Sequence, residues 1–208
     1  NRFIITLRGD RLTVDLNGQI VLENAHLPGV PSRGPIALQH HGEVIAGAIC
    51  NPMMEELFVV EKGKGAFLNG KRLAVSATAA LTRALLSTGF PYDIRVNPDN
   101  NINYFAEMAV RAQAIRRAGA AALDLAYVAA GRFDGFWELK LHPWDTAAGC
   151  LMVTEAGGVV TDLFGGPFDL YSPHILATNG MIHGAMTDVL KGTDPMDARL
   201  IKGPGYRV

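Results

Sequence analysis

Two carboxylates on either side of a short loop, Glu138 and Asp145, have the residue types and spacing to do chemistry. Glu138 closes an aromatic, strand-forming run, and Asp145 follows Pro143, a residue suited to the first turn of a helix. Free N–H groups and the helix dipole favour a negative charge in that turn. Carboxylates at a strand–helix junction supply the oxygen ligands that Mg²⁺ prefers.

Each carboxylate also has a purely structural interpretation. Asp145 is either a helix-capping residue or a ligand of a hard cation. Glu138 is either a solvated strand end or a group that reaches the crevice where open α/β sheets bind ligands. The residue pattern alone leaves both alternatives open.

A second stretch of interest covers residues 115–126 and predicts a tight strand-to-helix turn built from small residues. Gly119, Ala120 and Ala121 lie where that helix begins. Small residues there would let a ligand approach the backbone N–H groups at the helix N-terminus. The same residues are equally explained by close packing of the turn.

The elements that must position these residues change character near residue 80. Short strands joined by turns between residues 36 and 68 predict an antiparallel sheet, and Asn69-Gly70 is a strong hairpin signal. Further along, strands alternate with helices, which predicts a layered α/β arrangement. We expect strands at 85–88, 114–116, 133–138, 159–160 and 175–177. We expect helices at 102–114, 120–130 and 182–190, besides one that begins at Pro143 and stops at Gly157.

This pattern predicts an antiparallel-sheet part at residues 1–80, an α/β part at 81–192 and a tail at 193–208. The first 35 residues are the least regular. Their apolar runs, residues 3–5 and 11–16, suit either helix or strand fragments, with a turn at Asn17-Gly18.

Composition restricts the class of protein. The chain has 208 residues, of which 49% are hydrophobic and 19% charged, which suits a globular fold with a sizeable core. A net charge of −1 gives no basic face for nucleic acid and no polybasic segment for a membrane surface. Without a leader or an apolar run of membrane-spanning length, we expect a cytoplasmic protein. Cys50 and Cys150 are expected to be buried free thiols rather than a disulfide.

A long and specific pattern occurs at residues 137–138, 143–149, 153–158 and 166–169, with a further match at 115–126. It resembles the inositol monophosphatase family, whose members are Mg²⁺-dependent, lithium-inhibited phosphomonoesterases. The resemblance runs almost continuously from residue 36 to about 190. It implies an α/β (α+β) fold, a layered αβαβα sandwich of the inositol monophosphatase and fructose bisphosphatase type.

The resemblance also implies roles for individual residues. Asp145 matches the family's ligand of the second metal ion. Glu138 matches the carboxylate that holds a sugar or inositol hydroxyl, and Gly119, Ala120 and Ala121 match a substrate-binding turn. The family often has Ser or Thr where this chain has Ala120, so substrate bound here lacks that hydroxyl contact.

Two metal-binding motifs of the family are missing before residue 36. No Gly-Glu-Glu occurs, and residues 30–35 replace the expected Asp-Pro-x-Asp-Gly-Thr loop; we interpret the Asp-Pro-x-Asp at 194–197 as coincidental. Three interpretations are open: the sequence omits disordered loops, it is a shortened form, or the protein has diverged and lost the motifs. We favour the first because the resemblance does not decay after residue 36.

The function expected from the resemblance is Mg²⁺-dependent hydrolysis of inositol monophosphate or a related small sugar phosphate. The resemblance implies that one metal ion activates a water for in-line attack, while the other, held partly by Asp145, stabilises the leaving oxygen. One alternative is a phosphatase for another small phosphate, such as fructose bisphosphate, histidinol phosphate or a 3′-phosphonucleotide. Another is a non-catalytic regulatory member that binds a protein partner, for example transcription machinery. We expect a homodimer that binds a small phosphorylated metabolite and neither a membrane nor nucleic acid directly.

Overall fold

The structure is a computed structural model that describes residues 3–8, 11–16, 19–26, 36–40, 43–172 and 174–194. Its contacts divide the chain into two units, residues 1–34 and 35–208. The first unit contains a three-stranded antiparallel sheet in the order β1 (Phe3–Arg8), β2 (Arg11–Leu16) and β3 (Gln19–His26). The ambiguous apolar runs near the N-terminus are therefore strands, and the turn predicted at Asn17-Gly18 lies outside the described residues.

The second unit begins with a five-stranded antiparallel meander. Asn69 and Gly70 form its last turn with φ of 47° and 80°, the positive angles that a two-residue hairpin turn requires. The predicted succession of hairpins is thus confirmed. In chain order its strands are β4 (Ile36–His40), β5 (Glu43–Asn51), β6 (Glu56–Glu61), β7 (Gly65–Leu68) and β8 (Lys71–Arg72).

A second, mixed sheet follows, with the strand order β10-β9-β11-β13-β12. The strands β9, β10 and β11 run parallel to one another, while β12 and β13 are antiparallel to their neighbours. The carboxyl ends of the three parallel strands therefore meet at one edge of the sheet. The bounds of its strands are β9 (Leu85–Thr88), β10 (Ala114–Arg116), β11 (Gly135–Leu139), β12 (Val159–Thr161) and β13 (His174–Thr178).

The helices of this unit are α1 (Ile102–Ala109), α2 (Ala121–Ala129), α3 (Pro143–Glu155) and α4 (His183–Lys191), with a 3₁₀ turn at Leu81–Arg83. The start and end of α3 were predicted correctly. By contrast α1 is shorter than predicted, because the N–H groups of Gln113 and Ala114 bond the carbonyl of Ala84 and draw the chain into the sheet.

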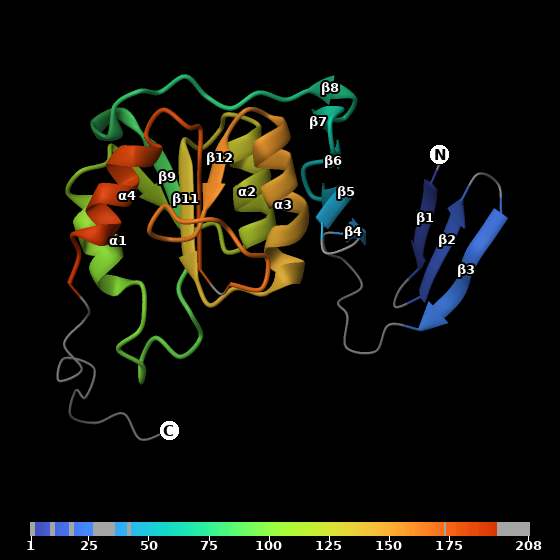
Figure 1. The fold of residues 1–208 in the computed structure, drawn as a ribbon, viewed down its shortest axis with the longest axis horizontal. Helices are drawn as coiled ribbons and strands as arrows, with labels where there is room; N and C mark the ends of the chain where they lie inside the picture. Colours follow the sequence, from blue (N-terminus) through green and yellow to red (C-terminus); the bar gives the residue numbers. More distant parts are fainter. Residues whose placement is uncertain are drawn as a thin grey trace. The chain divides into compact units, whose positions relative to one another are not determined.

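Helices α2 and α3 pack between the two sheets of this unit, and α1 and α4 cover the other face of the mixed sheet (Figure 1). One core lies around Phe58, Leu125 and Met152, and the other around Trp137 and Met186. Across the described part of this unit the layers follow the order β, α, β, α. The mixed α/β architecture agrees with the predicted fold class.

On the far face of the antiparallel sheet, Leu57 and Val59 of β6 are exposed, because β6 alternates buried and exposed side chains. Cys50 is also exposed, so its predicted burial was wrong: it pairs with Leu57 and shares this face. Cys150 is partly buried, and both thiols are free as expected.

The boundary predicted at residue 80 falls in the connection between the two sheets, inside the second unit, and stays a prediction. The tail beyond residue 194 lies outside the described residues. Among the helices that the structure describes, none has the length and apolarity needed to cross a membrane.

Candidate active site

The predicted site residues gather at the edge where the parallel strands end. Glu138 lies near the end of β11, Gly89 follows β9, and Arg117 follows β10. The two helices that come next in the chain, α2 and α3, start from this edge, so their N-termini face the same region. Ligands of open α/β sheets bind at this place because strand ends and helix N-termini converge there.

The side chain of Glu138 lies against the backbone of Gly89. A Cβ atom at Gly89 would overlap the Glu138 carboxylate, so the close approach requires glycine. Sequence reasoning missed Gly89, because nothing near it in the sequence indicates that a carboxylate from β11 crosses to β9.

A buried hydrogen-bond network holds the strand ends that carry Gly89 and Glu138 together. The side-chain amide of Asn101 donates to the Gly89 carbonyl at 2.6 Å and to Thr88 Oγ1 at 2.7 Å. The indole Nε1 of Trp137 donates to Asn101 Oδ1 at 2.6 Å, and Thr88 Oγ1 donates to the Trp137 carbonyl at 2.5 Å. The side chains of Asn101, Thr88 and Trp137 are all buried, so the network connects β9 to β11 next to Glu138 in the sequence.

Burial, together with the negative charges of Asp124 and Asp145, raises the pKa of Glu138 to about 7, while the positive charge of Arg117 opposes the rise. The repulsion from Asp145 also indicates that the two predicted carboxylates lie in one electrostatic environment. Glu138 therefore changes charge near neutral pH. Carboxyl groups with pKa values shifted in this way are found more often at functional sites than elsewhere.

Asp124, in the first turn of α2, is a third carboxyl group at this edge that sequence reasoning did not single out. It is 1% exposed, and burial raises its pKa to about 7, against lowering by the Ser87 hydroxyl and a backbone hydrogen bond at Ala120. Although Ser87 lies near enough to influence it, Asp124 Oδ1 and Ser87 Oγ both lack a hydrogen-bond partner in the described structure. Such unpaired buried polar atoms are uncommon and often lie near functional sites.

Asp145 caps the start of α3, as its structural interpretation predicts. The N–H of His142 donates to Asp145 Oδ2 at 2.9 Å, and the N–H of Asp145 donates to the His142 carbonyl at 2.9 Å. Within the described residues, Asp145 forms no ion pair and its other oxygen accepts no hydrogen bond. Capping thus leaves one carboxylate oxygen for a cation, so the two interpretations of Asp145 are compatible.

The predicted substrate-binding turn is open to solvent. Gly119 has a φ of +88°, which favours glycine, and the space beside it is empty. Ala120 is the N-cap of α2 and makes no side-chain capping bond, so it leaves the first N–H groups of the helix without a side-chain partner. Gly119 and Ala120 are exposed and Ala121 is half-buried.

Aromatic side chains border the same edge. His142 and Trp144 stack with ring centroids 4.6 Å apart, and Trp144 is exposed. The guanidinium of Arg117 lies 5.2 Å from the centre of the Phe90 ring, a cation–π distance.

Residues 35–192 match the model of the inositol monophosphatase family. This match covers more than half of the sequence. The chain belongs to the inositol monophosphatase family.

Curated relatives agree with this family assignment. The chain is 43% identical over 164 residues to an inositol-1-monophosphatase of Mesorhizobium japonicum, which covers 79% of this chain and 61% of the relative. It is 49% identical over 146 residues to the Nus factor SuhB of Pseudomonas aeruginosa, covering 69% of this chain and 54% of the relative. The chain thus spans between about half and two thirds of the length of these relatives.

Solved structures of the family share the fold. An inositol monophosphatase from Anabaena aligns with a TM-score of 0.76 at 43% identity, over 77% of this chain and 64% of that one. The Thermotoga maritima IMPase aligns with a TM-score of 0.69 at 33% identity, over 88% of this chain and 61% of that one.

The metal donors of this family member are incomplete in the part of the chain that the structure describes. No group of three or more His, Cys, Asp or Glu side chains there could hold a metal ion. Asp145 suits a hard cation by its chemistry and its position, but it belongs to no such group among the described residues.

Proposed function

We propose that this protein is a Mg²⁺-dependent phosphomonoesterase that acts on inositol monophosphate or a related small sugar phosphate. One observation carries the proposal. Glu138 on β11, Asp145 in the first turn of α3 and the uncapped N-terminus of α2 all lie at the edge where the parallel strands end. An anionic, hydroxyl-rich ligand needs this combination of a carboxylate, free backbone N–H groups and a cation ligand.

In this proposal, the Glu138 carboxylate binds the hydroxyl groups of the substrate. The ionised carboxylate accepts hydrogen bonds from neighbouring hydroxyls, whereas the protonated form has less acceptor capacity. Because the pKa of Glu138 is raised to about 7, substrate affinity should increase as the pH rises through 7.

The turn at Gly119, Ala120 and Ala121 presents backbone N–H groups to the oxygens of the substrate. Since Ala120 provides no hydroxyl, this contact depends on the main chain alone. The positive end of the α2 dipole adds attraction for an anion at the same place.

Asp145 would contribute one carboxylate oxygen to a Mg²⁺ ion. When bound, Mg²⁺ stabilises charge on phosphoryl oxygens and makes a coordinated water more acidic. Asp145 can provide this oxygen without losing its bond from His142, so the start of α3 stays ordered in either state.

The test is phosphate release by the purified protein with and without Mg²⁺, using inositol monophosphate, fructose bisphosphate, histidinol phosphate and a 3′-phosphonucleotide. We expect release that requires Mg²⁺ and is fastest with inositol monophosphate or another sugar phosphate. No release from any of the four substrates would reject the proposal.

A second candidate function is a regulatory role exerted through a protein partner. It is favoured by one observation, the 49% identity to a relative named Nus factor SuhB. If this were the function, variants of Glu138 and Asp145 would keep partner binding. We favour the enzyme because a partner-binding role does not require Glu138, Asp145 and the start of α2 to lie at one edge of the sheet. We further propose a homodimer, which light scattering can test.

A further inference from the structure

Lys140 adopts a backbone conformation that its side chain does not favour. It has a φ of +61°, and the only other described non-glycine residues with positive φ are Glu55 and Asn69, both in hairpin turns. Glycine or asparagine suits this conformation better than lysine. Lys140 lies two residues after Glu138, at the start of the loop that leads to Asp145, so its backbone sets the direction of that loop.

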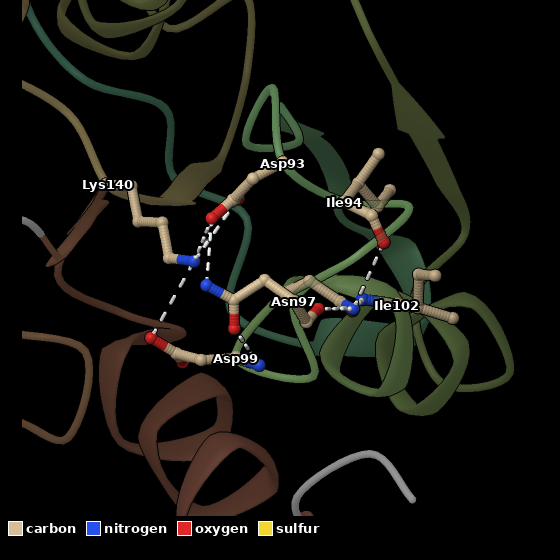
Figure 2. A network of polar contacts seen from close by, with 7 residues as sticks. Asp93, Ile94, Asn97, Asp99, Ile102 and Lys140 are labelled. Atoms are coloured by element: carbon tan, nitrogen blue, oxygen red, sulfur yellow. Dashed lines mark hydrogen bonds and ion pairs between the residues drawn. The ribbon is translucent and has the colours of Figure 1, made fainter. Parts of the chain in front are cut away.

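The side chain of Lys140 compensates with charged contacts to the segment that follows β9. Its Nζ lies 3.0 Å from Asp93 Oδ2, 3.2 Å from Asp93 Oδ1 and 3.9 Å from Asp99 Oδ2. Figure 2 shows Lys140 and Asn97 approaching the Asp93 carboxylate together. The Lys140 side chain is 25% exposed, so this ion pair is partly shielded from water.

Asp93 is itself held in place. The amide of Asn97 donates to Asp93 Oδ2 at 2.8 Å, and Asn97 Oδ1 accepts from the N–H of Asp99 at 2.9 Å. Two hydrogen bonds hold the pKa of Asp93 below its usual value: the one from Lys140 has the larger effect, and the one from Asn97 adds to it. The carboxylate is therefore ionised and oriented at neutral pH.

The segment from Gly89 to Asn101 is thereby attached to β11 and its loop at two points. Asn101 bonds Trp137 inside the protein, and Asp93 bonds Lys140 nearer the surface. In the sequence, Glu138 lies between Trp137 and Lys140, the two residues that these bonds hold. Its own carboxylate contacts Gly89, at the start of the same segment.

We propose that Lys140 is a positioning residue, whose amine binds Asp93 and thereby fixes Glu138 and the loop to Asp145 for substrate binding. This inference rests on the proposed phosphatase function for its kinetic consequence, but not for its structural one. Lysine occupies a position that suits glycine because its amine connects the two loops that border the site.

The experiment compares K140M, K140G, K140R, D93N and the double variant D93N/K140M in the full chain. We expect K140M and D93N each to raise KM for the best substrate about five- to tenfold with kcat within about twofold. The double variant should be no worse than either single variant, since both remove one interaction. K140R should recover most of the affinity, whereas K140G, which relieves the backbone, should resemble K140M.

The matched control is K64M, which removes the exposed ion pair between Lys64 and Glu61 at the β6–β7 turn. That turn is bound by Glu155, at the opposite end of α3 from Asp145. K64M should leave KM unchanged. A K140G variant with wild-type KM would overturn the inference, and so would additive effects of D93N and K140M.

Hydrogen exchange supplies a readout that does not need catalysis. Amides of residues 139–145 and 90–97 should exchange faster in K140M, K140G and D93N than in the wild type, and at the wild-type rate in K64M. Unchanged exchange in the three variants would overturn the inference even if the enzyme is active. If the wild type releases no phosphate, the proposed function fails and exchange alone decides the role of Lys140.

Discussion

At the scale of single residues, three carboxyl groups share the edge where the parallel strands end. The pKa of both Glu138 and Asp124 is raised to about 7, mainly by burial, and the charges of Asp124 and Asp145 contribute to the rise at Glu138. Three full negative charges here would repel one another in the absence of a cation. An edge of this kind suits a ligand that brings positive charge or donates hydrogen bonds.

Asp124 should make stability depend on pH. In the native state the pKa of Asp124 is about 7, so the group keeps its proton up to about pH 7, whereas the unfolded chain releases it near the ordinary pKa of 3.8. Because the native state binds more protons in this range, the free energy of unfolding falls as the pH rises from 4 to 7. Replacing Asp124 with Asn removes the buried charge, so the variant should gain about 1–3 kcal/mol over the wild type at pH 8 and little at pH 4.5.

Chemical denaturation at several pH values measures this difference. Asp188→Asn, at an exposed position of α4, is the control: its free energy of unfolding should change with pH as that of the wild type does. If the Asp124 variant also runs parallel to the wild type, Asp124 is not the buried titrating group.

Gly89 should be required for binding rather than for folding. In Gly89→Ala the new methyl group displaces the Glu138 carboxylate, which is the end of a flexible side chain, so stability should change by less than about 1 kcal/mol. Substrate KM should nevertheless rise at least about tenfold. Gly184→Ala, where a methyl group meets nothing within 4 Å, is the matched control for steady-state kinetics and should keep the wild-type KM. An unchanged KM in Gly89→Ala would mean that Glu138 does not contact substrate.

At the scale of elements, the Asn101 network should stabilise the pairing of β9 and β11. Asn101→Ala leaves the Trp137 indole N–H and the Gly89 carbonyl without their partner in a buried position. Each unpaired group costs about 1–3 kcal/mol, so we expect a loss of about 2–4 kcal/mol in thermal or chemical unfolding. Asn103→Ala, which removes an exposed bond to the Asp194 carbonyl, should cost less than about 1 kcal/mol. Equal losses in the two variants would argue against a buried network.

Local signals were enough to predict the elements that carry the predicted site residues. The aromatic run before Glu138, the proline at Pro143 and the glycine at Gly157 correctly indicated a strand, a helix start and a helix end. The end of α1 could not be predicted, because it depends on a bond to Ala84, far away in the sequence. Gly89 and Asp124 were missed for the same reason, since their roles arise from contacts between strands and helices that a single sequence does not specify.

At the scale of the whole molecule, two sheets and an intervening helix layer bring together residues from distant parts of the second unit. The family match covers residues 35–192, and the chain spans between about half and two thirds of its relatives. The site edge itself is built from β9, β11 and the starts of α2 and α3, all inside the matched range.

In the proposed function, Asp145 makes phosphate release at this edge depend on Mg²⁺. The most direct measurement is the initial rate of phosphate release from inositol monophosphate against Mg²⁺ concentration, for the wild type and for Asp145→Asn. Asparagine keeps an oxygen that can accept the bond from His142, so folding should be preserved while the negative charge is lost. We expect Mg²⁺-dependent release by the wild type and a loss of at least about a hundredfold in the variant. Equal rates and equal Mg²⁺ dependence in the two proteins would contradict it.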